Sequence, residues 1–416
     1  MHIVSILEEG KEVDVVYLDF AKAFDKVDYG ILLQKLKRIG IAGNLLSWVH
    51  SFLTNRFQKV CVDGALSERA PVHSGVPQGS SLGPLLFLIH IHDINEDLLH
   101  STAASFADDT RLIGCIEDNR DRQLLQDDLN RIYAWAANNN MSFNGEKFEI
   151  MRYGNILENS LPLYQPDGES IKEVEEVKDL GVLMARSATF ESEIQHAVLQ
   201  SNRQASWALR VFRTRQQTPM MTLFRSLVRP HLEYCCQLWS PVKLGLIRRL
   251  EGVQRSYTAR IAGLQNRNYW ERLVLLKLQS LERRRERYQV IYIYKIISGH
   301  VPNFVNARFK INITVSERRG RSCMIPSLNT TASLRYQTIA DHSFAVRGAK
   351  LFNVLPKKLR NYQGSSDSFK TVLDTFLAKI RDQPCTIGYH QPAASNSLID
   401  QVAQMKLEGL LLNEYH

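Results

Sequence analysis

The chain has 416 residues, 44% of them hydrophobic and 23% charged. These values are close to the averages for folded soluble proteins and exclude a wholly disordered chain. The longest apolar stretch, residues 82–94, is interrupted by His90, His92 and Asp93 and is shorter than the roughly 20 residues that a membrane-spanning helix needs. The six cysteines have no CxxC spacing, so the sequence predicts no zinc site of the ribbon or finger type.

The formal net charge of +9 is concentrated in one part of the chain. Residues 203–287 contain 18 Lys and Arg against five Asp and Glu, a formal charge of +13. A local basic excess of this kind indicates an anionic partner such as nucleic acid. The first residues, MHIVSILEEGKEVD, contain charged residues before any long apolar run, so neither a signal peptide nor a transit peptide is expected. We therefore expect an intracellular protein, located in the cytoplasm, the nucleus or both.

The first 114 residues alternate between strand, helix and loop patterns. Residues 13–20 (VDVVYLDF) are apolar almost throughout and predict a strand covered on both faces, and residues 21–39 have helical spacing. Residues 58–70 predict a short hairpin. Residues 74–84 (SGVPQGSSLGP) contain too much Gly and Pro for regular structure and predict a shaped loop that opens a helix. Residues 105–114 (SFADDTRLIG) predict two strands joined by a tight turn.

Helices dominate the remainder of the chain. Residues 121–137 have helical periodicity, short strand-like pieces follow around 141–153 and 177–184, and long helices are expected from about 190 to 299. The last hundred residues are less regular in pattern. Together these elements predict an α+β fold.

Three aspartates stand at predicted strand ends. Asp19 lies near the end of one strand, and Asp108 and Asp109 lie at a turn about ninety residues later. Phosphoryl transfer needs carboxylates on rigid adjacent strands, because they can hold two divalent cations that activate the attacking hydroxyl and neutralise the leaving pyrophosphate. A pair of aspartates alone is weak evidence, since Asp127 and Asp128 form another pair in a helical pattern, where we expect both to face water.

Three segments in this order resemble the reverse transcriptases of non-LTR retrotransposons, the LINE class. They are YLDFAKAFDKVD (17–28), SGVPQGSSLGPLLF (74–87) and FADD (106–109). The likeness continues more loosely through WAANNNMSFNGEK (135–147), KDLGV (178–182) and later segments as far as VRGAKLFNVLPKKLR (346–360).

The resemblance implies an RNA-directed DNA polymerase that uses two Mg²⁺ ions, with Mn²⁺ as an alternative. Its partners would be an RNA template, a DNA primer and deoxynucleoside triphosphates, and no membrane. It also implies a polymerase palm over residues 1–185, built as an antiparallel sheet with helices on one face. A helical basic thumb would follow over residues 186–300, and a partly irregular C-terminal region over 301–416.

The resemblance assigns the site residues as well. It implies that Asp19, Asp108 and Asp109 are the catalytic carboxylates and metal ligands, with the backbone carbonyl of Phe20 as a further ligand. Phe24 matches the aromatic residue that packs under the sugar and excludes a 2′ hydroxyl. The residue pattern alone favours a different role for Phe24, that of a core-facing helix residue. Neither Asp25 nor Asp28 is expected to bind metal.

Three further residues of the site follow from the resemblance. Gln78 and Gly79 match the loop that approaches the nascent base pair, where glycine permits close approach of backbone; an ordinary turn is the alternative. Lys147 matches a lysine that protonates the departing pyrophosphate as a general acid. The following residue, Phe148, departs from the small polar residue usual there, and a solvated surface lysine is the alternative for Lys147.

Nucleic-acid contacts are expected in the second half of the chain. Leu180 and Gly181 resemble a hairpin that grips the primer, with a plain strand turn as the alternative. The basic helices are expected to follow the phosphates of a duplex, or to present a solvated charged face instead. The arginines assigned to this contact are Arg248, Arg249, Arg283, Arg284 and Arg285.

Members of the resembled family carry a basic fingers region, and usually an endonuclease, upstream of the first motif. Only about eighteen residues precede Asp19 in this sequence. The expectation is therefore an N-terminally truncated enzyme whose nucleotide pocket lacks one wall. The alternative is a catalytically inactive element product that only binds nucleic acid.

Overall fold

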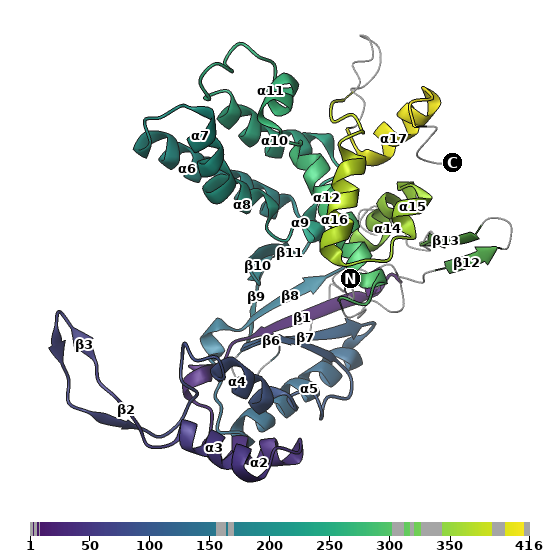
Figure 1. Ribbon diagram of the computed structural model, residues 1–416. Helices are drawn as coiled ribbons and strands as arrows, with labels where there is room; N and C mark the ends of the chain where they lie inside the picture. The colour runs from purple at the N-terminus through teal and green to yellow at the C-terminus, as the bar shows by residue number, and fades with distance from the viewer. Residues whose placement is uncertain are drawn as a thin grey trace. The chain divides into compact units, whose positions relative to one another are not determined.

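The computed structural model describes residues 3, 6, 7, 9–154, 164, 170–301, 312–316, 320–325, 343–384 and 396–411 (Figure 1). These residues form two compact units. One comprises Gly10–Val177, and the other consists chiefly of the chain from Lys178 onward.

The first unit is built on a five-stranded sheet with the order β6-β7-β1-β8-β9. The central strand is antiparallel to both neighbours, and only the short β9 runs parallel to β8. The central strand contains valines with no exposed surface at positions 13, 15 and 16, which agrees with the prediction of a strand covered on both faces. The strands are β1 (Glu12–Leu18), β6 (Thr102–Phe106), β7 (Asp109–Ile116), β8 (Glu149–Tyr153) and β9 (Lys172–Glu173).

Helices of the first unit share one hydrophobic core with this sheet. The core joins Val16, Leu112 and Ile150 of the sheet to buried side chains of α2, α4 and α5, and Figure 1 draws α4 and α5 below the sheet. Four α-helices are present among the described residues of this unit: α2 (Tyr29–Arg38), α3 (Gly43–Leu53), α4 (Gly83–Ile91) and α5 (Asn119–Asn138). The antiparallel sheet with its helices agrees with the predicted α+β palm.

A two-stranded ribbon extends from this unit between α3 and the loop at residues 74–84 (Figure 1). In it β2 (Arg56–Gln58) pairs with β5 (Ala70–Val72), and β3 (Cys61–Val62) pairs with β4 (Ala65–Leu66). The ribbon confirms the hairpin that was predicted for residues 58–70 and extends it at both ends.

The region predicted as one helix from residue 21 to 39 is divided in two. A short 3-10 helix, η1 (Ala23–Asp25), is followed by a break before α2. The side chain of Asp28 caps α2 by accepting a 2.9 Å hydrogen bond from the backbone of Ile31. The apolar spacing continued across the break, so periodicity alone could not detect it; the cap could have signalled it, because Asp is a favoured N-cap residue.

The second unit is mainly helical. It contains the hairpin formed by β10 (Glu176–Asp179) and β11 (Val182–Ala185), which begins at the end of the first unit. One hydrophobic core of this unit joins β11 to buried residues of the helices between 191 and 281. These helices are α6 (Glu191–Val211), α7 (Gln217–Leu223), the π-helical η4 (Phe224–Val228), α8 (Arg229–Glu233), α9 (Cys236–Trp239), α10 (Leu244–Thr258), α11 (Tyr269–Leu276) and α12 (Leu281–Ile297).

The C-terminal part is more regular than its sequence pattern indicated. Its helices pack with α12 around a second core that contains Phe352, Phe369 and Leu398. The helices are α14 (Phe344–Val354), α15 (Lys357–Arg360), α16 (Ser366–Leu377) and α17 (Leu398–Leu407), and a hairpin of β12 (Asn312–Ser316) and β13 (Gly320–Met324) precedes them. The prediction of a partly irregular region falls in part on residues outside the described ranges, and the predicted boundaries at 185 and 300 remain predictions.

Candidate active site

The sheet brings two of the predicted carboxylates to adjacent positions. In the pairing of β1 with β7, Leu18 lies opposite Thr110. Continuing this register by one residue sets Asp19 opposite Asp109. Residues directly opposite in an antiparallel pair have Cα atoms about 4.5–5.5 Å apart and point to the same face of the sheet. The two carboxylates therefore share one face at the end of the central strand.

Asp108 belongs to the tight turn between β6 and β7. Phe106 pairs with Asp109 across this hairpin, which leaves Ala107 and Asp108 as the two turn residues. Ala107 has a φ of 53°, a left-handed conformation that a two-residue hairpin commonly requires at its first position. The predicted turn is confirmed, with Asp109 as the first residue of the second strand rather than part of the turn.

Electrostatic coupling shows that the three carboxylates lie near one another. Partial burial and the nearby charges of Asp108 and Asp19 raise the pKa of Asp109. Like charges oppose ionisation when they are close. Positive charge placed beside these carboxylates would therefore stabilise their ionised forms.

Lys147 supplies such a charge. It lies in the 3-10 helix η2 (Gly145–Lys147), and its Nζ donates a 2.7 Å hydrogen bond to Oδ2 of Asp19. This bond, the charge of Asp19, and the charges of Asp108 and Asp109 raise the pKa of Lys147. The lysine side chain is 64% exposed and that of Asp19 is 25% exposed, so water can reach both groups. The structure thus brings Lys147 to the carboxylates, as the resemblance implied, although the two residues are 128 positions apart.

The backbone of Phe20 is oriented toward the same end of the sheet. Phe20 forms an isolated antiparallel bridge with Phe143. The two hydrogen bonds of this bridge run from Ala21 to the carbonyl of Ser142 and from Asn144 to the carbonyl of Asp19. In a bridge of this type the N–H and C=O of the bridged residue point away from the paired segment. The Phe20 carbonyl therefore points away from Phe143 and to the β7 side, where Asp109 lies.

The donor set suits divalent cations, since carboxylate and carbonyl oxygens are the ligands that Mg²⁺ prefers. Among the described residues, however, no group of three or more His, Cys, Asp or Glu side chains is placed to hold a metal ion. Lys147 Nζ is bonded to Oδ2 of Asp19, and partial burial and the negative charges of Asp108 and Asp19 raise the pKa of Asp109. The assignment of two metal ions to these residues remains a prediction.

Gln78 and Gly79, two of the predicted substrate residues, lie on a loop held against η1, which contains Phe24. The side chain of Gln78 is exposed and its Nε2 donates a 3.0 Å hydrogen bond to Oδ1 of Asp25. Gly79 has a φ of 76°, which favours glycine. Phe24 is partly buried and its ring stacks on the buried ring of Phe87, with 4.3 Å between centroids. That contact supports the core role of Phe24, and its role against a sugar remains a prediction.

Two of the arginines assigned to nucleic acid are buried instead. Arg283 and Arg285 are each 1% exposed, and their guanidinium groups bond to the backbone carbonyls of Arg381 and Leu232, respectively. Arg284 forms a bidentate ion pair with Glu233. The prediction that this triplet contacts phosphates is therefore wrong for Arg283 and Arg285, because guanidinium groups that are buried and bonded to backbone carbonyls cannot reach a duplex.

The other residues assigned to nucleic acid are accessible. Arg248 and Arg249 are exposed on α10. Leu180 and Gly181 form the turn of the β10–β11 hairpin with φ values of 46° and 84°. The Leu180 carbonyl accepts a 2.8 Å hydrogen bond from the hydroxyl of Tyr234. Both a plain strand turn and a grip on a primer are compatible with this geometry, and the grip remains a prediction.

Asp128 was expected to face water, and this expectation is wrong. The residue has no exposed surface. It accepts hydrogen bonds of 3.1, 2.9 and 2.8 Å from the backbone of Leu99, His100 and Ser101, and one of 2.7 Å from the Ser101 hydroxyl. These residues lead directly into β6, so Asp128 anchors the strand that precedes the Asp108 turn. No local pattern indicates this role, because the hydrogen-bond partners come from a loop about thirty residues away.

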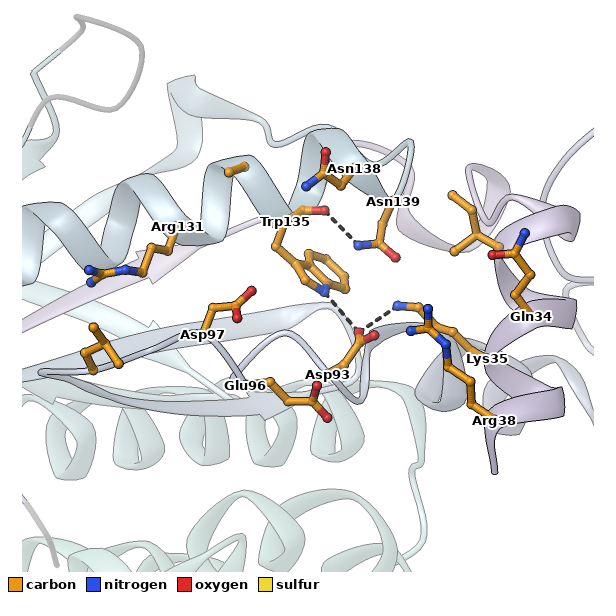
Figure 2. Close-up of a pocket in the computed structure, with 13 residues that line it drawn as sticks. Gln34, Lys35, Arg38, Asp93, Glu96, Asp97, Arg131, Trp135, Asn138 and Asn139 are labelled. Atoms are coloured by element: carbon orange, nitrogen blue, oxygen red, sulfur yellow. Dashed lines mark hydrogen bonds and ion pairs between the residues drawn. The ribbon is translucent and has the colours of Figure 1, made fainter. Parts of the chain in front are cut away.

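A cavity of about 740 Å³ lies on another part of the first unit, between α2, the segment after α4, and α5 (Figure 2). At its floor the buried Lys35 donates 2.6 Å hydrogen bonds to Asp93 and to the carbonyl of His90, and the Trp135 indole also bonds to Asp93. Burial lowers the pKa of Lys35. None of the predicted site residues lines this cavity, and sequence reasoning did not find it.

Residues 3–184 match the family described as reverse transcriptase (RNA-dependent DNA polymerase). This segment is similar to that family, and the match covers somewhat less than half of the chain. The segment contains Asp19, Asp108, Asp109 and Lys147, which are all the residues predicted to be catalytic, and also the loop with Gln78.

The relatives of the chain come from mobile elements. The chain is 30% identical over 275 residues to the RNA-directed DNA polymerase from mobile element jockey of Drosophila melanogaster, covering 61% of this chain and 29% of that protein. It is 26% identical to the probable RNA-directed DNA polymerase from transposon X-element of the same species, with 63% and 30% covered. A type-1 retrotransposable element R2 polyprotein of Popillia japonica is 27% identical, with 39% and 29% covered. The chain therefore spans under a third of the length of these relatives.

Solved structures of telomerase are also similar to the chain. Telomerase from Candida albicans in complex with a fragment of telomeric RNA is 12% identical, with a TM-score of 0.38 over 70% of this chain and 47% of that one. Apo telomerase from Candida tropicalis is 11% identical, with the same TM-score over 71% and 48%. Within the described ranges of the chain, none of the helices has the length and apolar character needed to traverse a bilayer.

Proposed function

We propose that this chain carries out RNA-directed DNA synthesis, extending a DNA primer along an RNA template with deoxynucleoside triphosphates. The observation that carries the proposal is the position of Asp19 opposite Asp109, beside the Asp108 turn, inside the segment that is similar to the reverse transcriptase family. Carboxylates held on adjacent strands of one sheet provide the fixed negative charge that nucleotidyl transfer requires. The relatives named above are polymerases of mobile elements, which supports the same reaction here.

Asp19, Asp108, Asp109 and the Phe20 carbonyl are the groups that would hold Mg²⁺ or Mn²⁺. Cations bound there would supply activation of the primer 3′ hydroxyl and neutralisation of the triphosphate charge. The sheet contributes rigidity, because Asp19 directly follows β1 and Asp109 begins β7, and these two strands are hydrogen-bonded neighbours. Preorganised groups of this kind act without reorganising during the reaction.

Lys147 is proposed as the proton donor to the departing pyrophosphate. The hydrogen bond and the charge of Asp19 raise its pKa, so the ammonium form predominates at neutral pH. A general acid must carry its proton and reach the departing group, and Lys147 lies beside the carboxylates at which the triphosphate is proposed to bind. The lysine would have to leave Asp19 to take this role, and its exposure permits that movement.

Gln78 and Gly79 are proposed to face the nascent base pair, and Phe24 the sugar. Exposed arginines of the second unit are proposed to contact the phosphates of the duplex. Exposed arginines of this unit include Arg203, Arg210, Arg213, Arg248 and Arg249. Such contacts release counterions, so the affinity for a duplex should fall steeply with salt. Because RNA and deoxynucleoside triphosphates are intracellular, we place this activity in the cytoplasm, the nucleus or both.

The test is extension of a labelled DNA primer on an RNA template with Mg²⁺ or Mn²⁺. We expect extension by the wild-type chain, loss of at least about a hundredfold in Asp108→Ala, and full activity in Asp127→Ala, whose side chain only accepts a 3.3 Å bond from Gln123 on the surface of α5. Lack of incorporation by the wild-type chain with either metal would overturn the proposal.

A second candidate is nucleic-acid binding without catalysis. The exposed arginines of the second unit favour it, as does the lack of a three-ligand cluster for a metal ion among the described residues. Salt-dependent duplex binding that is equal in the wild type and in Asp108→Ala, together with no incorporation by either protein, would support this candidate over the polymerase.

A further inference from the structure

The loop that carries Gln78 is attached to the η1 turn by its backbone. The backbone N–H of Gly75 donates a 2.9 Å hydrogen bond to the carbonyl of Val27, and that of Val76 donates one of 2.9 Å to the carbonyl of Phe24. The hydroxyl of Ser74 donates a 2.8 Å bond to the carbonyl of Asp25. Three consecutive loop residues are thus fixed to the four residues that follow Ala23.

Glycine at position 75 is required for this attachment. Its φ is 83°, and a Cβ built there would lie 2.7 Å from both the Cα and the carbonyl oxygen of Asp25. Arg56 holds the outer side of the loop, since its guanidinium donates to the Gly75 carbonyl at 2.5 Å and to the Tyr29 hydroxyl at 2.6 Å. These contacts hold the loop backbone against the Asp25 backbone independently of the side chains of Asp25 and Gln78.

The side chains of Asp25 and Gln78 meet across this junction. The Nε2 of Gln78 donates a 3.0 Å hydrogen bond to Oδ1 of Asp25. An ionised carboxylate can only accept hydrogen bonds, so it excludes the flipped carboxamide, in which the Gln78 oxygen would face it. Asp25 consequently leaves Oε1 of Gln78, and one remaining N–H, for other partners.

We propose that Asp25 is a positioning residue that fixes the carboxamide orientation of Gln78 for the incoming nucleotide. It would present Oε1 as the acceptor for a donor group of the nucleotide or the nascent base pair. The inference rests on the proposed function and adds a role for an aspartate that is not among the predicted metal ligands. Both side chains are exposed, so the hydrogen bond by itself is weak; the fixed backbone lowers the entropy that the contact must overcome.

The variants Asp25→Ala and Asp25→Asn separate contact from orientation. Alanine removes the partner of Gln78. Asparagine is nearly the same size and can still bond to the carboxamide, but its own amide can face either end of Gln78, so the orientation is no longer enforced. Asp127→Ala is the matched control, because it removes a half-buried acid on α5 whose hydrogen bond is to Gln123 and not to Asp25 or Gln78. Circular dichroism and thermal melting verify that each variant folds.

The measured quantities are kcat and KM for the deoxynucleoside triphosphate in primer extension. In Asp25→Ala we expect KM to rise about three- to tenfold, the range that the loss of one net hydrogen bond produces, with kcat within about twofold of the wild type. Asp25→Asn should raise KM by an intermediate factor. A general loss of structure would instead lower kcat and thermal stability together, and that result would overturn the inference.

A double-mutant cycle with Gln78→Ala gives the decisive result. If Asp25 acts through Gln78, Asp25→Ala should have no further effect on KM in the Gln78→Ala background. An undiminished effect there would overturn the inference while leaving the proposed polymerase intact.

The two proposals can fail separately. If the wild-type chain does not extend a primer, the proposed function fails, and the same cycle is then measured on the Kd for the deoxynucleoside triphosphate in equilibrium binding. Coupling between the two sites in Kd would support the role of Asp25. Additive effects, or no binding by the wild type, would overturn it.

Discussion

Replacement of Asp128 by alanine should destabilise the first unit strongly, although the residue is not one of the predicted catalytic carboxylates. The carboxylate has no exposed surface and accepts from three consecutive backbone N–H groups, those of residues 99, 100 and 101. It also accepts from the Ser101 hydroxyl and pairs with Arg131 at 2.6 Å. Alanine removes every acceptor at once.

The magnitude follows from the donors that would remain. A buried donor without an acceptor costs about 1–3 kcal/mol. The three N–H groups around Asp128 are only partly buried, so water can replace some of the lost bonds and the lower end of that range applies to each. We therefore expect a loss of about 3 kcal/mol, which corresponds to a fall in Tm of about 6–12 °C for a unit of this size.

The assay compares urea and thermal unfolding of Asp128→Ala with that of Asp127→Ala. The neighbouring aspartate is its natural control, because its side chain makes only one 3.3 Å bond on the exposed face of α5, and its removal should change the free energy of unfolding by less than about 0.5 kcal/mol. Equal stability of the two variants would refute the structural role of Asp128.

The pH dependence provides an independent measure of the same contact. Burial tends to raise the pKa of Asp128, but the bonds from Ser101, Leu99, His100 and Arg131 outweigh it, and the pKa is lowered. A group with a lowered folded-state pKa contributes stability that is present above its unfolded pKa, about 3.9, and is lost as the pH falls below it. The wild type should therefore lose more stability than Asp128→Ala between about pH 5 and pH 2. Parallel curves for the two proteins would argue against an ionised Asp128.

Three further changes have defined outcomes. Gly75→Ala should destabilise the chain by about 2 kcal/mol or more in urea unfolding, because its φ is 83° and its Cβ would lie 2.7 Å from the Asp25 backbone; a neutral result would show that the loop can move away. Ala107→Gly should stabilise the chain by about 0.5–1 kcal/mol, since glycine adopts the φ of 53° without the steric cost of a Cβ; a lower Tm would count against this. Lys147→Met should tighten Mn²⁺ binding, measured by electron paramagnetic resonance, because its Nζ competes for Asp19 Oδ2. Lys59→Met, which changes an exposed lysine of the ribbon, should leave the Mn²⁺ affinity unchanged. Equal Mn²⁺ affinities in the two variants would show that Lys147 does not compete with the ion for Asp19.

Local patterns in the sequence determined much of the first unit. The apolar run before Asp19 predicts a covered central strand, because both faces of such a strand must be buried. The density of Gly and Pro between residues 74 and 84 predicts a shaped loop, since neither residue supports regular structure. The strand, turn and strand around Asp108 follow from alternation and turn chemistry over ten residues. Each of these signals depends only on neighbours along the chain.

Pairing of distant segments was decided by the tertiary structure. No sequence pattern sets Asp19 opposite Asp109; the register of β1 against β7 does. Lys147 reaches Asp19 across 128 residues, and Gln78 reaches Asp25 across 53. These contacts depend on how the strands align and where the loops pack. The free energy that selects one alignment is a sum over the contacts of a whole core, and a local sequence pattern does not contain it.

The sequence likewise did not indicate which charged side chains are buried. The run LERRRER at residues 281–287 reads as a solvated or phosphate-binding face, yet Arg283 and Arg285 are enclosed and their neighbour Arg284 pairs with Glu233. Asp127 and Asp128 are chemically identical and adjacent, but one faces solvent and the other anchors a strand. The sequence determines which groups carry charge and where helices and strands begin. Only the packed structure determines which of those charges lose contact with water, because that depends on the segments folded over them.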